Sequence, residues 1–98
     1  MADLETKAIR IALKLWPDHP AKIRVRNTRG GYAYKNGNIT IPVWVMHSTK
    51  PGYTMYFIAH ELAHIKAPWE TKPHGQEFVE AFKSLCPKSY WRYEHFCK

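Results

Sequence analysis

The string His60-Glu61-Leu62-Ala63-His64 restricts the possible folds of this chain more than any other part of its sequence. It lies inside a largely apolar stretch, residues 53–66, whose apolar residues recur at helical spacing. Residues four apart on a helix lie one above the other, so the two histidines share a face. Because burying two imidazoles and a carboxylate without partners is costly, the fold must place a compensating group beside them.

A zinc ion is the partner that this spacing predicts. Two imidazoles one helical turn apart can hold a single zinc ion, and Glu61 can then reach a water molecule bound to it. A chain of this composition would contain only about 0.02 such strings by chance. The alternative is that His60 and His64 are ordinary core histidines satisfied by hydrogen bonds. We expect His60 and His64 to bind zinc and Glu61 to be the catalytic base.

The third zinc ligand must come from outside this helix, because a catalytic zinc site typically has three protein ligands and one open position. We expect it to be His74, which nine residues separate from His64 and which precedes the last predicted helix. The prolines at 68 and 73 bracket a connection that can turn His74 back toward the helix. The rival ligands are Glu70, Glu77 and Glu80.

The rest of the chain predicts one α+β domain over residues 1–98. An amphipathic pattern predicts a helix over residues 3–16, and residues 75–85 predict a last helix. Alternating polar and apolar residues predict three strands, over 22–27, 32–35 and 38–45. Asn36-Gly37 is a strong hairpin signal between the second and third strands. We expect a small three-stranded antiparallel sheet, with Pro42 at an edge or a bend. Residues 88–98 receive no assignment.

The charge of the chain, formally +7, is unevenly distributed. No acidic residue occurs between Asp18 and Glu61, a segment that is otherwise rich in lysine and arginine. Such a segment favours a polyanionic partner, most simply nucleic acid, although a solvated basic face would give the same pattern. The candidate contact residues are Lys22, Arg24, Arg26 and Arg29.

The remaining composition predicts a cytoplasmic protein without a membrane partner. No apolar run approaches the roughly 18 residues of a spanning helix, and the first residues lack the apolar stretch of a signal peptide. Two cysteines do not make a disulfide scaffold, and we expect Cys86 and Cys97 to be thiols. A second metal site from Cys86, His95 and Cys97 has no recognisable zinc spacing.

Two segments of the chain resemble a known family. The string His60-Glu-Leu-Ala-His64, followed by Pro73-His74-Gly75-Gln-Glu-Phe78, is similar to the SprT-like zinc metallopeptidases and the related YgjP/Wss1 group. The resemblance implies a zincin-like minimal core of a helix, a small antiparallel sheet and the zinc helices. It also implies that His60, His64 and His74 are ligands and that Glu61 is catalytic. No four-cysteine zinc ribbon follows here, unlike in the longer members.

These patterns together predict a peptidase that hydrolyses peptide bonds by Glu61-assisted attack of a zinc-bound water. Its substrate would be a protein or peptide, with DNA-associated proteins as one class, and the strand over residues 39–45 could bind it by strand addition. One alternative is a non-catalytic, zinc-stabilised nucleic-acid-binding module. Another is a metal-dependent hydrolase for a different substrate, such as a nucleic acid.

Overall fold

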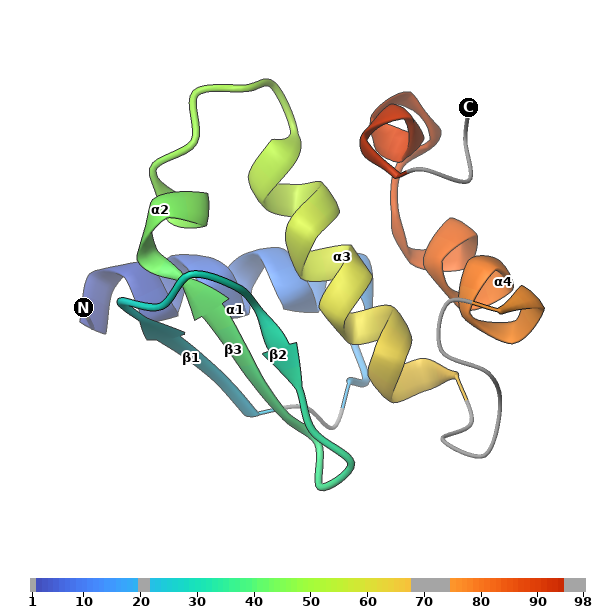
Figure 1. Ribbon diagram of the computed structural model, residues 1–98, viewed down its shortest axis with the longest axis horizontal. Helices are drawn as coiled ribbons and strands as arrows, with labels where there is room; N and C mark the ends of the chain where they lie inside the picture. The colour runs from blue at the N-terminus through green and yellow to red at the C-terminus, as the bar shows by residue number, and fades with distance from the viewer. Residues whose placement is uncertain (1, 20–21, 68–74, 95–98) are drawn as a thin grey trace.

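The computed structural model describes residues 2–19, 22–67 and 75–94 of this 98-residue chain. Helices pack against one face of a small sheet, which confirms the α+β class (Figure 1). The elements, in chain order, are α1 (Ala2–Leu15), β1 (Lys22–Arg26), β2 (Tyr32–Ala33), β3 (Asn38–Pro42), α2 (Val43–Met46), α3 (Tyr53–Lys66), α4 (Gln76–Leu85) and the 3-10 helix η1 (Lys88–Tyr93).

The hairpin between β2 and β3 forms where the sequence predicts it. Gly37 adopts a φ of 93°, which glycine reaches without steric cost. The amide of Asn38 donates to the Asn36 side chain at 3.0 Å, and the amide of Tyr34 donates to the Asn38 carbonyl at 2.9 Å. The two strands are therefore antiparallel, as expected.

The sheet is not antiparallel throughout, which corrects our expectation. Its order is β1-β3-β2, and β1 runs parallel to β3. Alternation along a strand fixes which face is buried but leaves its neighbour and direction open. The chain leaves β1, forms β2 at a distance and returns through the hairpin, so that β3 lies between the other two strands. A central strand has both edges paired, so β3 cannot bind a peptide by strand addition, and the expectation for residues 39–45 is wrong.

The third strand is also shorter than predicted, because it ends at Pro42 and α2 begins at Val43. Proline donates no backbone hydrogen bond, and its fixed φ, here −65°, suits the residue before a helix. The prediction of a bend at Pro42 is confirmed, while that of an edge strand is wrong.

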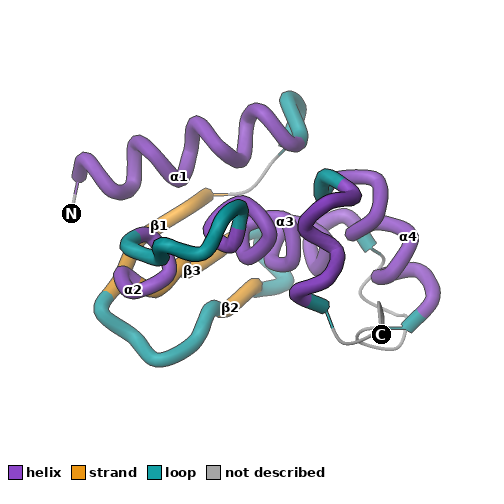
Figure 2. Tube along the Cα trace, turned by 90° about the horizontal axis from the view of Figure 1, so that it is seen from above, coloured by secondary structure: helices purple, strands orange, loops and turns teal. Residues whose placement is uncertain are grey.

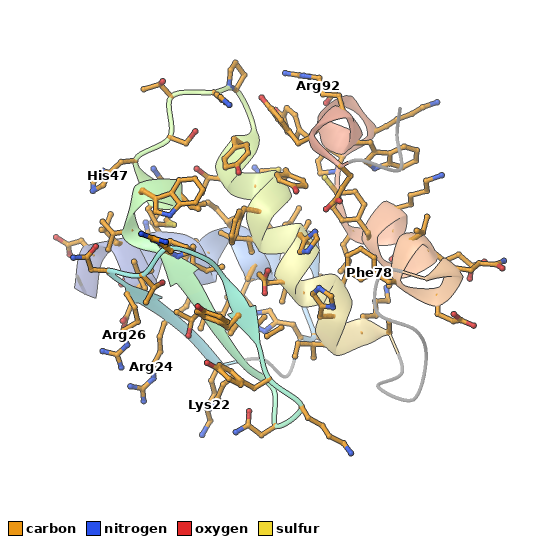
Figure 3. The ribbon with its side chains drawn as sticks, in the orientation of Figure 1. Lys22, Arg24, Arg26, His47, Phe78 and Arg92 are labelled. Atoms are coloured by element: carbon orange, nitrogen blue, oxygen red, sulfur yellow. The ribbon has the colours of Figure 1, made fainter. Side chains whose placement is uncertain are left out.

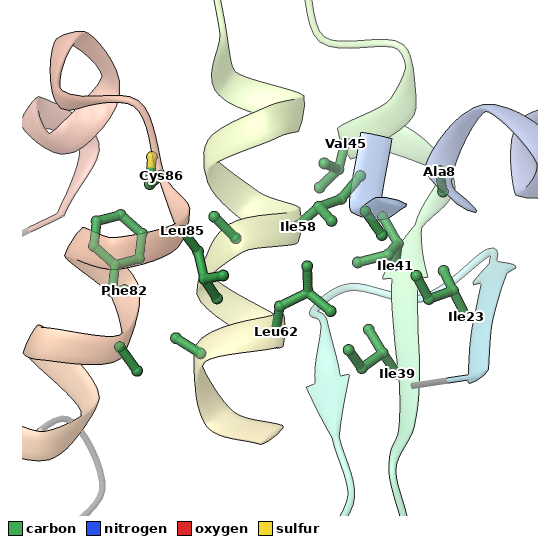
Figure 4. Packing of buried hydrophobic residues seen from close by; sticks show 14 of the residues in the cluster. Ala8, Ile23, Ile39, Ile41, Val45, Ile58, Leu62, Phe82, Leu85 and Cys86 are labelled. Carbon is green, nitrogen blue, oxygen red and sulfur yellow. The ribbon is translucent and has the colours of Figure 1, made fainter. Parts of the chain in front are cut away.

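Helix α3 is the centre of the molecule. Its Ile58 and Leu62 point toward the sheet and are fully buried against Ile39 and Ile41 (Figure 4). On its other side lies α4, which buries Phe82 (Figures 1 and 4). Helix α1 packs against β1 and α3, as the view from above shows (Figure 2). The string of two histidines and a glutamate is thereby held on a helix that packs against the sheet, α1 and α4.

None of the helices described in residues 2–19, 22–67 and 75–94 is long and apolar enough to cross a lipid bilayer.

Candidate metal centre

The two histidines of α3 lie side by side, as the sequence predicts. Their ring centroids are 5.1 Å apart and their planes are inclined by 71°. Zinc binds an imidazole nitrogen at about 2.0–2.1 Å, so two imidazoles on one tetrahedral ion have centroids about 5 Å apart. The side chain of His60 is 20% exposed, and His64 is also partly exposed. Spacing, donor chemistry and access therefore all fit a zinc ion that needs an open position.

Phe78 of α4 forms an apolar wall against both imidazoles (Figure 3). Its ring centroid lies 4.6 Å from that of His64 and 5.0 Å from that of His60, and its side chain is only 2% exposed. This residue is the phenylalanine of the motif that carries the family resemblance. A large ring in this place restricts the rotamers of the histidines and lowers the local dielectric constant.

Glu61 is buried beside the histidines, with 5% of its surface exposed. Burial raises the pKa of its carboxyl group from 4.5 to about 7, since desolvation disfavours the charged form. The nearby His60 lowers this pKa and the charge of Glu94 raises it, but both effects are smaller than that of burial. A carboxyl group with a pKa near 7 can both accept and release a proton at neutral pH.

Gly31, just before β2, brings the sheet backbone close to Glu61. A Cβ atom at this position would overlap the ring of Phe57 and lie 3.2 Å from Glu61 Oε1. A larger residue here would have to displace the Phe57 ring for the backbone that enters β2 to pass so near the carboxyl group. The start of the edge strand β2 therefore lies next to the candidate catalytic residue Glu61.

Glu94 belongs to this site, although the sequence reasoning missed it. Its Oε1 contacts Nδ1 of His60, and only 7% of the residue is exposed. Glu94 also accepts a hydrogen bond from the Tyr56 hydroxyl group. Burial and the charge of Glu94 both raise the pKa of Tyr56. A histidine that donates Nδ1–H to a carboxylate keeps Nε2 for a metal. The one signal in the sequence is that Glu94 is the sole acidic residue after Glu80.

The third ligand is not identified within the described ranges. His74 and Glu70 lie outside them, so both stay predictions. The rivals Glu77 and Glu80 are exposed on α4, and Glu80 accepts a hydrogen bond from Gln76 at 3.1 Å. Among residues 2–19, 22–67 and 75–94, no three His, Cys, Asp or Glu side chains come together as a metal-binding group.

The basic residues predicted to contact nucleic acid lie away from the histidines. Lys22, Arg24 and Arg26 are exposed on β1 and point away from α3 (Figure 3). Arg29 is exposed in the connection that follows, and its carbonyl accepts a hydrogen bond from the Trp44 indole at 2.8 Å. These residues therefore form a surface of their own.

Comparison with known proteins adds one finding. No protein-family model matches the chain, and no curated protein matches it. Among solved structures, it is similar to the metallopeptidase zymogen abylysin of Pyrococcus abyssi, with 27% sequence identity and a TM-score of 0.59. The similarity covers 94% of this chain and 85% of the other. The SprT-like assignment stays a prediction, whereas the fold of this chain is metallopeptidase-like.

Proposed function

We propose that this protein is a zinc-dependent peptidase whose ion is held by His60, His64 and His74 and whose base is Glu61. The observation that carries the proposal is the buried Glu61 beside two imidazoles at the spacing of shared zinc ligands. The similarity to a metallopeptidase zymogen supports the same reaction class. When bound, zinc would polarise the scissile carbonyl group and lower the pKa of a water molecule.

Glu61 performs the proton transfers. Its carboxylate accepts a proton from the attacking water and passes it to the leaving amine. The pKa near 7 that burial gives this group suits both steps at neutral pH. Phe78 excludes water from one side of the imidazoles, which strengthens electrostatic interactions there.

Strand β2 is the element best placed to bind a peptide substrate. It is an edge strand, so one side of its backbone is unpaired within the three-stranded sheet. Gly31 holds the backbone at its start close to Glu61. An extended peptide that adds to this edge would have its backbone fixed beside the catalytic carboxyl group.

The test is a comparison of zinc content and cleavage among three proteins: wild type, Glu61→Gln and His74→Ala. Zinc is measured by elemental analysis, and cleavage by mass spectrometry of a mixed peptide library. We expect about one zinc per chain and cleavage in the wild type. We expect Glu61→Gln to retain zinc without cleavage, and His74→Ala to bind zinc weakly.

Two outcomes would contradict the proposal in different ways. A wild-type protein with zinc that cleaves no peptide, while binding nucleic acid tightly, would support the non-catalytic module. Zinc binding unaffected by His74→Ala but lost in Glu77→Gln would assign the third ligand to α4.

A further inference from the structure

The outer face of the sheet combines basic and aromatic side chains in register. Arg24, Thr40 and Tyr32 are neighbours across the three strands, so their side chains lie on the same face. The opposite face carries Ile23 and Ile39, which are buried in the core. The row with Arg24 is therefore on the side of the sheet turned away from α3.

Two tyrosines form an exposed stacked pair on this face. Tyr32 and Tyr34 are two residues apart, and each has 48% of its surface exposed. Their ring centroids are 6.3 Å apart, with an angle of 30° between the planes. Large rings exposed to this extent on a small protein lose apolar contact with the core. Their stacked arrangement offers flat surfaces to a planar ligand.

Three cations lie on the same face as the tyrosines, across the central strand β3. Lys22, Arg24 and Arg26 alternate along β1, are exposed, and point together away from the sheet (Figure 3). Within the ranges that the structure describes, no ion pair involves any of them. Residues 19–60 contain no aspartate or glutamate, so neither β2 nor β3 places a negatively charged side chain on this face. The face is thus positively charged with little internal compensation.

We propose that this outer sheet face, defined by Lys22, Arg24, Arg26, Tyr32 and Tyr34, binds single-stranded nucleic acid. The cations would contact successive phosphates, and unpaired bases would stack on the tyrosine rings. In a duplex the faces of the bases are stacked inside the helix. Its phosphates could contact the cations, but its bases could not stack on the tyrosine rings. An acidic peptide likewise matches the charge but gains nothing from stacking. The proposal does not depend on the peptidase activity.

Fluorescence anisotropy with a labelled 12-nucleotide oligothymidine measures this binding directly. At low salt we expect the single strand to bind more tightly than a duplex of equal length. Tyr32→Ala should weaken binding about tenfold, because it removes a ring on which a base stacks. Tyr32→Phe keeps the ring and should retain most of the affinity.

The salt dependence separates the role of the cations. The slope of log affinity against log salt should fall by about 0.7 in Arg24→Ala, the value for one lost phosphate contact on a single strand. Lys88→Ala removes an equal charge from η1, outside the sheet, and should leave the slope unchanged. A 12-mer without bases cannot stack on the rings. The wild-type protein should therefore bind it about as weakly as Tyr32→Ala binds oligothymidine.

Three results would overturn the proposal. The first is no measurable binding of the single strand at low salt. The second is equal affinity for single strand and duplex, together with no effect of Tyr32→Ala, which would leave only charge attraction. The third is an equal slope change in Arg24→Ala and Lys88→Ala, which would place binding outside the sheet face.

Discussion

In the metal-free protein, ionisation of Glu61 should lower the free energy of unfolding as the pH rises, and replacing Glu61 with glutamine should remove this loss. The folded protein keeps the Glu61 proton up to about pH 7, whereas the unfolded chain releases it near 4.5. Stability from the neutral carboxyl group is therefore complete below pH 4.5 and is lost progressively as the pH rises to about 7. One pKa unit corresponds to about 1.4 kcal/mol, so this loss amounts to about 3 kcal/mol.

Glutamine has nearly the same shape and does not ionise. The difference in unfolding free energy between Glu61→Gln and wild type should therefore grow by about 3 kcal/mol in favour of the variant between pH 4.5 and pH 8. For a domain of about 100 residues, this corresponds to a rise in Tm of more than about 10 °C. Titrating groups that do not interact with Glu61 act alike in both proteins, so their effects cancel in the difference.

Urea denaturation followed by circular dichroism, in the presence of a chelator, measures this difference at four or five pH values. Glu77→Gln changes an exposed carboxylate of α4 and serves as the control, with a difference that stays within about 0.5 kcal/mol. A Glu61→Gln difference that is constant with pH would refute the conclusion that burial raises the pKa of this group.

Other substitutions test the remaining contacts. Glu94→Ala should weaken zinc binding about 10- to 100-fold in a competition assay with a chromogenic chelator, and Glu94→Gln should weaken it less because its amide oxygen can still accept from His60. Gly31→Ala should destabilise the protein by about 1–3 kcal/mol in urea denaturation, and by less in a Phe57→Leu background, where the shorter side chain relieves the overlap. Phe82→Ala should cost about 3–5 kcal/mol in the same assay, because this fully buried ring joins α4 to α3.

The local parts of the fold could be predicted from the sequence. Helix α3 has the predicted bounds, Tyr53–Lys66, because its apolar spacing covers four turns without interruption. The Asn36-Gly37 turn forms as predicted, because few dipeptides other than this one tolerate its backbone angles. The neighbouring histidines and the buried Glu61 lie on this helix, so predicting the helix also predicted this part of the site.

What depends on distant residues could not be predicted in this way. The parallel pairing of β1 with β3 depends on where the intervening chain travels, and alternation carries no information about that path. The contact of Glu94 with His60 joins residues 34 apart in the sequence. No period or motif connects them, and the pairing follows only from how η1 packs against α3.

The two borders of the sheet differ in a way that bears on self-association. At the outer border of β1, the amide of Val25 donates to the Glu5 carboxylate of α1 at 3.3 Å. A strand that approached this border would have to displace α1. The border formed by β2 is only two residues long. Unbroken stacking of copies into a fibril needs two open borders on each molecule, so strand pairing between copies would end at a dimer.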